Sequence, residues 1–144
     1  MDTRLTTNPM RSGLHYYLEQ QFNSFHNFPI ETDLDNLNAD VAILGIPFGD
    51  PYSMGEASND QAFAPTHIRR HCGRALRGLD RYDFDIGGTL LDGRDIKVVD
   101  CGDVIGIAKD VAGNHARSEA AVKKILAAGA LPIILGGDHA IPIP

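Results

Sequence analysis

The clearest structural signal in the sequence is the run Leu131-Pro-Ile-Ile-Leu-Gly-Gly-Asp-His139. Its apolar part shows no polar alternation, which predicts a strand buried on both faces, as in a parallel sheet. The two glycines then permit a tight turn, so Asp138 and His139 should lie just past the carboxyl end of the strand, where open α/β sheets bind ligands. We take His139 as the candidate metal ligand and Asp138 as a turn residue that supports it, because adjacent side chains point in different directions. On spacing alone, an ordinary polar loop is an equally good interpretation.

Further strands and helices are expected before this strand. The sequence predicts strands at 41–46 and 96–100, and helices at 65–77 and 114–128, the second capped by Asn114. Alternation of strands and helices at these spacings implies right-handed crossovers and an α/β fold, a three-layer parallel β-sheet with flanking helices. The side chains expected to be buried are Ile68, Cys72, Ala75 and Leu76 in the first helix and Val122, Ile125 and Leu126 in the second.

The remaining segments are predicted to be less regular. Residues 1–38 are interpreted as an N-terminal arm over the domain or a neighbouring subunit, with a helix at Ser12–Phe22, and residues 39–144 as part of an α/β domain. The stretch 48–64, rich in Gly, Ser, Asn, Asp and Pro taken together, should be a long loop, and such loops are often functional. Residues 79–95 are expected to form a loop or a small hairpin around Gly87-Gly88.

Composition narrows the class of protein. The 144 residues are 43% hydrophobic, enough for one domain core, and the net charge of -6 with a pI near 5.4 argues against nucleic-acid binding. Four arginines in and around the first helix are expected to form a solvated or interface face: Arg69, Arg70, Arg74 and Arg77.

Cysteine usage and hydropathy predict a soluble cytoplasmic protein without a membrane partner. Cys72 and Cys101 define no disulfide framework, which fits a reducing compartment. Residues 1–21 lack the apolar core of a secretory signal, and no segment has the roughly 20 apolar residues that span a bilayer.

Simpler roles suit the other potential ligands. His67 and His71 share a helix face, but without a third ligand an exposed pair of this kind is usually unremarkable. Asp100 and Asp103 flank the end of the second strand, at the same sheet edge as His139. They are more simply turn carboxylates bonded to backbone amides than members of its site.

Three ordered motifs give the sequence a family resemblance. Ala39-Asp-Val-Ala-Ile-Leu-Gly-Ile-Pro-Phe48, Val99-Asp-Cys-Gly-Asp-Val104 and Leu135-Gly-Gly-Asp-His139 resemble, in this order, motifs of the ureohydrolases, the arginase and agmatinase family. Two departures are Ala140, where the family usually has Ser, and Ala64-Pro65 in place of Gly-Pro. The family's Asp-Ala-His-x-Asp and Asp-x-Asp-x-x-Asp motifs, which supply the other metal ligands, do not occur in the 144 residues.

The resemblance implies a manganese-dependent amidinohydrolase. In the family, two Mn²⁺ ions activate a bridging water that attacks the guanidinium carbon, releasing urea and an amine. His139 would bind one ion. Agmatine, and with it polyamine metabolism, is the expected substrate class because the Gly45-Ile-Pro-Phe48 opening looks agmatinase-like, and a homo-oligomer is the expected assembly. Met54 and Asn59 in the loop 49–63 are candidate substrate contacts, although a solvent loop or subunit contact fits them as well.

Other functions also fit these sequence features. The sequence resembles only the N-terminal portion of the family, so the isolated chain is expected to be inactive and its last strand to expose apolar surface. A noncatalytic remnant or assembly partner is one alternative, and a formiminoglutamate hydrolase is another. A nucleotide-binding module ranks last because the first strand lacks a Gly-x-Gly-x-x-Gly turn and no Gly-Lys-Ser/Thr loop occurs.

Overall fold

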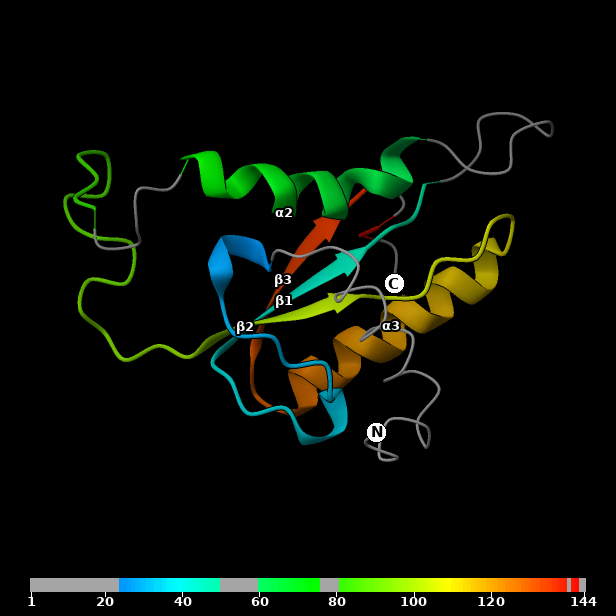
Figure 1. Ribbon diagram of the computed structural model, residues 1–144. Coiled ribbons are helices and arrows are strands. Elements are labelled where there is room, and N and C mark those ends of the chain that lie inside the picture. The colour runs from blue at the N-terminus through cyan, green and yellow to red at the C-terminus, as the bar shows by residue number, and fades with distance from the viewer. Residues whose placement is uncertain (1–23, 50–59, 76–80, 140, 143–144) are drawn as a thin grey trace, which may run out of the picture.

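The fold is a parallel sheet between two helices, seen in a computed structural model that describes residues 24–49, 60–75, 81–139, 141 and 142, without the side chains of 73–75. The strands are β1 (Val41–Ile46), β2 (Val98–Asp103) and β3 (Leu131–Gly136), in the order β2-β1-β3. Helix α2 (Ala64–Ala75) and helix α3 (Val111–Ala127) lie on opposite faces of the sheet (Figure 1). The predicted three-layer α/β architecture is confirmed. The predicted helix Ser12–Phe22 and the end of the first predicted helix lie outside the described residues.

Strand β1 lies at the centre of the core because it pairs with both other strands. Its side chains alternate between the two faces, as a strand requires. Ala42, Leu44 and Ile46 join the larger apolar cluster with Ile125 of α3, whereas Ile43 belongs to a smaller cluster on the face that α2 covers. Gly45 falls on the α2 face, where it leaves room for polar side chains described below.

Strand β3 is not buried on both faces, and this prediction was wrong. Leu131 is 62% exposed and Ile133 43% exposed, whereas Leu135 on the same face is buried. Within the described residues β3 pairs with β1 alone, so it is an edge strand, and its first half is left without cover. The unbroken apolar run therefore predicted the strand correctly but not its position at the edge of the sheet.

Helix α3 begins earlier than predicted. Asp110 is its N-cap and accepts a hydrogen bond from the Gly113 amide at 3.1 Å, so Asn114, the predicted cap, lies inside the first turns and is buried. Ile125 is fully buried as expected and Val122 packs against the core, but Leu126 is 56% exposed. Ala121 takes the buried position instead, because the helix is rotated by about one residue relative to the predicted stripe.

Helix α2 follows directly on a short 3-10 helix, η4 (Asp60–Phe63). Its predicted apolar stripe is only partly correct, since Ile68 is 37% exposed and Cys72 is half-buried. Pro65 and Arg69 are the fully buried side chains of this helix among those described. A charged residue therefore occupies the position that faces the sheet.

The segment 24–38 packs against the sheet and contains two 3-10 turns, η2 (Phe25–Asn27) and η3 (Leu34–Asn36). Ile30 forms a parallel bridge with Asp100 on the outer side of β2: the Glu31 amide donates to the Asp100 carbonyl at 3.0 Å and the Asp100 amide to the Pro29 carbonyl at 2.9 Å. Leu34 and Leu37 are buried in the larger apolar cluster.

Residues 81–97, which precede β2, extend away from the sheet (Figure 1). A single antiparallel bridge joins Asp83 to Gly88, in agreement with a small hairpin around the predicted glycines. Among the helices that the structure describes, none is long and apolar enough to cross a membrane.

Candidate active site

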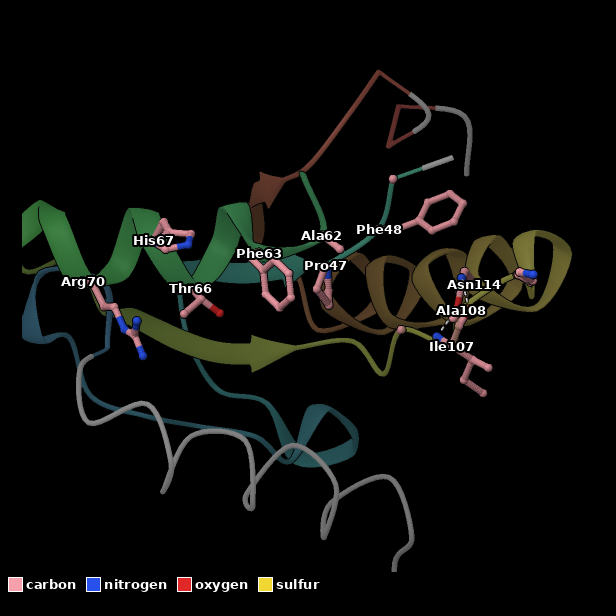
Figure 2. Close-up of a pocket in the computed structure, with 13 residues that line it drawn as sticks. Pro47, Phe48, Ala62, Phe63, Thr66, His67, Arg70, Ile107, Ala108 and Asn114 are labelled. Carbon is pink, nitrogen blue, oxygen red and sulfur yellow. Dashed lines mark hydrogen bonds between the residues drawn. The ribbon is translucent and has the colours of Figure 1, made fainter. Parts of the chain in front are cut away.

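The carboxyl ends of the three strands lie at one edge of the sheet, and a pocket opens there. Its volume is about 470 Å³. One wall comes from η4 and α2, and the other from the segments that follow β1 and β2 (Figure 2). The lining residues are Pro47, Phe48, Gly49, Ala62, Phe63, Thr66, His67, Arg70, Gly106, Ile107, Ala108, Lys109 and Asn114.

The turn after β3 brings His139 to the same edge. The Asp138 amide donates to the carbonyl of Phe48, a pocket residue, at 3.4 Å. A Cβ on Gly137 would lie 2.2 Å from the Phe48 carbonyl oxygen and 2.7 Å from that of Gln61, so only glycine allows this close approach. His139 is exposed, and it is not among the residues that line the pocket.

The described residues supply one candidate metal ligand but no metal site. No group of three His, Cys, Asp or Glu side chains in the described ranges is arranged to hold an ion. His67 and His71 are both exposed and their rings stack at 6.4 Å between centroids, with no third ligand from the described part of the chain. His139 therefore fits as one member of a donor set, and no step through a metal follows from these residues alone.

Asp100 and Asp103 do not turn toward His139, because both are bound to Arg69 of α2. The Arg69 Nε and one terminal nitrogen donate to the two Asp100 oxygens at 2.8 and 2.9 Å, and the other terminal nitrogen donates to Asp103 Oδ1 at 2.5 Å. Arg69 is only 2% exposed, so its predicted place on a solvated or interface face was wrong. Three charged side chains are thus fully enclosed between α2 and the sheet.

Backbone groups complete this buried network. Asp100 also accepts from the Phe25 amide at 2.7 Å and from the Gly102 amide at 2.9 Å, as the turn-carboxylate interpretation predicted, and Arg69 donates to the Gly102 carbonyl at 3.1 Å. Such satisfaction is what makes enclosed charges tolerable. Burial lowers the pKa of Arg69, but its bonds to the two carboxylates outweigh burial and hold that pKa above the usual value.

A β-bulge explains how both carboxylates reach Arg69. Residues three apart in a regular strand point to opposite faces. Here, however, Ile43 of β1 pairs with Asp100 of β2, and Gly45 of β1 pairs with Asp103 of β2. Three residue steps on β2 therefore lie opposite two on β1. Gly102 takes up the extra residue with a φ of +74°, which glycine adopts without strain. The bulge therefore turns Asp103 to the α2 face beside Asp100.

The loop after β2 is held by the first turns of α3. The Asn114 side chain accepts a hydrogen bond from the Ile107 amide and donates one to the Ile107 carbonyl, both at 2.8 Å. It thus satisfies both backbone groups of Ile107, as a neighbouring strand residue does in a sheet. Arg117 donates to the Ile105 carbonyl at 3.0 Å, to Asp110 at 3.0 Å and to the Asn114 carboxamide oxygen. The pocket wall at 105–110 is consequently fixed before any ligand binds.

Sequence reasoning did not find Arg69, Arg70, Lys109 or Asn114 as site residues. A usable signal was present for Arg69, because two aspartates beside apolar strand residues need a cationic partner once they are buried. Met54 and Asn59, the predicted substrate contacts, lie outside the described residues, and the role of His139 as a metal ligand stays a prediction.

The profile of the arginase family matches residues 39–144. The chain belongs to the arginase family. It is 35% identical over 99 residues to a formimidoylglutamase of Halalkalibacterium halodurans, covering 67% of this chain and 29% of that protein. It is 31% identical over 122 residues to an agmatinase of Photorhabdus laumondii, covering 83% of this chain and 37% of that protein. The chain thus spans about a third of the length of these curated relatives.

A solved structure supports the same fold. The proclavaminate amidino hydrolase of Streptomyces clavuligerus superposes with a TM-score of 0.59 at 24% identity, over 84% of this chain and 37% of that one. At this identity the likeness is evidence for the fold. The family resemblance that the three sequence motifs predicted is confirmed.

Proposed function

We propose that the chain contributes His139 and the pocket to an active site that hydrolyses the amidino C–N bond of a small linear amidine, with manganese as the metal. The observation that carries this proposal is the turn at Gly137–His139, which packs against Phe48, a residue that lines the pocket of about 470 Å³, although His139 itself is not among the lining residues. Bound divalent metal would supply a hydroxide nucleophile at neutral pH.

The residues of this chain have separate roles in the proposal. Gly137 keeps the turn narrow, so the imidazole of His139 is carried by a rigid strand end. Arg69 joins α2 to the end of β2 and thereby fixes the width of the pocket. Asn114 holds the opposite wall. The substrate would lie between these walls, with its amidino carbon toward His139.

Two substrate classes compete within this function. Agmatine-like guanidino amines, which would release urea and an amine, are supported by the Gly45-Ile-Pro-Phe48 motif and by the agmatinases among the relatives. Amidino acids, the class that includes formimidoylglutamate, are supported by the 35% identical formimidoylglutamase. The two classes differ in charge at the end remote from the amidino group, so the pocket lining is the feature that should discriminate them.

The test is Mn²⁺-dependent hydrolysis of both classes by the protein produced from its natural reading frame. We expect His139→Ala to reduce turnover at subsaturating metal and His71→Ala, a matched change of an exposed histidine outside the pocket lining, to leave it unchanged. Hydrolysis that is insensitive to His139→Ala, or no hydrolysis of any linear amidine, would refute the proposal.

A noncatalytic remnant or assembly partner is the second candidate, and the lack of a three-ligand cluster in the described residues favours it. Calorimetric titration with Mn²⁺ separates the two. A remnant shows no metal binding that depends on His139, whereas a site completed by further ligands shows binding that weakens in His139→Ala.

A further inference from the structure

The pocket is positively charged although the chain is acidic. Among the described residues that line it, the ionisable ones are His67, Arg70 and Lys109, with no Asp or Glu, whereas the chain carries a net charge of -6. A cleft lined by one sign of charge attracts the opposite sign. The pocket therefore favours an anionic group and disfavours a second cation.

Two of these cations have no protein partner in the described part of the chain. Arg69 and Arg117 are both engaged by carboxylates and carbonyls. By contrast, the side chains of Arg70 and Lys109 make no hydrogen bond or ion pair with any residue that the structure describes. Figure 2 shows Arg70 pointing to the same side of the helical segment as Thr66 and Phe63, both pocket residues.

The nearest acidic residue along the chain does not neutralise the pocket. Asp110 follows Lys109 directly, but its carboxylate caps α3 through the Gly113 amide and pairs with Arg117 at 3.0 Å. Lys109 has a φ of +65°, a backbone conformation that residues other than glycine rarely adopt. The loop that Asn114 and Arg117 hold thus presents a lysine to the pocket in a fixed backbone geometry.

Apolar side chains complete the lining. Phe63 is 56% exposed and Ile107 48% exposed, and Phe48 connects the pocket to the turn that carries His139. Exposed apolar side chains beside free cations suit a ligand that combines a short methylene chain with a carboxylate. A guanidino amine has a cation at both ends and matches this lining poorly.

We propose that the substrate is an amidino acid whose carboxylate binds Arg70 in this pocket, with Lys109 adding to the positive field. This inference rests on the proposed function and names its substrate class. Arg70 offers the planar fork that carboxylates bind in a bidentate manner, and Lys109 acts as a point charge. The positive field also orients the substrate, because it repels the amidinium end from the carboxylate site.

The test uses a matched pair of probes, 4-guanidinobutanoate and agmatine, which share a guanidinium group and a chain of the same length but end in a carboxylate or an amine. Binding to the 144-residue chain is measured by calorimetry, with folding checked by circular dichroism. We expect the acid to bind at least about tenfold more tightly than the amine, and the difference to shrink as salt is added.

The variants separate a specific site from a general charge effect. Arg70→Gln should weaken binding of the acid about tenfold and Lys109→Gln about threefold, whereas Arg94→Gln, in an exposed arginine outside the lining, should change nothing. Equal or tighter binding of agmatine, no binding of the acid to the folded chain, or equal effects of Arg70→Gln and Arg94→Gln would each overturn the inference.

These outcomes are distinct from those of the hydrolysis assay, because the binding measurement requires neither metal nor turnover. If the chain binds the acid through Arg70 but hydrolyses no linear amidine, the carboxylate site is supported and the proposed function is refuted. Hydrolysis that prefers agmatine has the opposite meaning, since the proposed function stands and the substrate class is wrong.

Discussion

Replacing Gly45 with alanine should break the buried network that joins α2 to β2. A Cβ at this position would lie 1.7 Å from Asp103 Oδ1, 2.8 Å from Asp103 Cγ and 3.0 Å from a terminal nitrogen of Arg69. Because contacts below 3.0 Å are essentially never tolerated, the carboxylate must move by roughly 1.3 Å or more. The 2.5 Å ion pair between Arg69 and Asp103 cannot survive such a shift.

The expected cost follows from the burial of the two partners. Arg69 is 2% exposed and Asp103 5% exposed, so water cannot replace the lost contact. Breaking a buried pair by displacing one partner costs about 3–5 kcal/mol. Asp100 remains bonded to Arg69, which places our expectation at the lower end, about 3 kcal/mol. That is a large share of the roughly 5–15 kcal/mol by which a domain is stable.

The assay is urea unfolding followed by circular dichroism, with Gly88→Ala as the matched control. A Cβ on Gly88 would meet only Asp92 Oδ1, at an ordinary 3.5 Å, so this change should cost less than about 1 kcal/mol. In an Asp103→Ala background the cost of Gly45→Ala should fall by more than half, because the main collision partner is gone. Equal costs for the two glycine variants, or an unchanged cost in the Asp103→Ala background, would refute the reasoning.

Three further changes probe the walls of the site and the sheet beneath it. Asn114→Ala should speed hydrogen exchange of the Ile107 amide and cost about 1–3 kcal/mol, because it removes both side-chain hydrogen bonds to that residue and leaves only the one from the Asp110 amide; unchanged exchange would show that the loop is held otherwise. Asp110→Ala should lower the free energy of unfolding by about 1 kcal/mol and Asp110→Asn by less, because asparagine still caps α3; equal losses in thermal melts would argue against the cap. Burial raises the pKa of Cys101 from 9.0 in the unfolded chain to about 12, so the stability that this thiol contributes is complete below pH 9 and is lost as the pH rises toward 12. Unfolding of Cys101→Ala should therefore depend less steeply on pH in that range, by up to about 1.4 kcal/mol per pH unit, and identical slopes would contradict the assignment.

The sequence predicted elements whose signals are local. The strand at Val41–Ile46 was predicted at its observed limits, because an apolar run that ends in a proline is a complete signal in itself. The third strand was predicted to within one residue. The second strand was predicted two residues early and three residues short, since its last part is polar and is stabilised by partners far away in sequence.

Features that depend on tertiary contacts were missed. Helical periodicity predicts a surface position for a charged residue such as Arg69. Its burial becomes favourable only through the two aspartates of a strand that is distant in sequence. The bulge at Gly102 cannot be inferred from periodicity, because one extra residue changes which face a side chain takes. Asn114 resembles a cap by residue type, and the structure uses the same carboxamide one turn later to hold a loop.

The short parallel bridge at Ile30 gives the sheet a direction of growth. Residues 29–31 occupy the outer hydrogen-bonding groups of β2 at Asp100, whereas β3 at the other side pairs with β1 alone in the described part of the chain. A strand from elsewhere can therefore join beside Leu131 and Ile133 more readily than beside β2. The edge of β2 is thus partly occupied at Asp100, and a further strand would extend the sheet more readily beside β3.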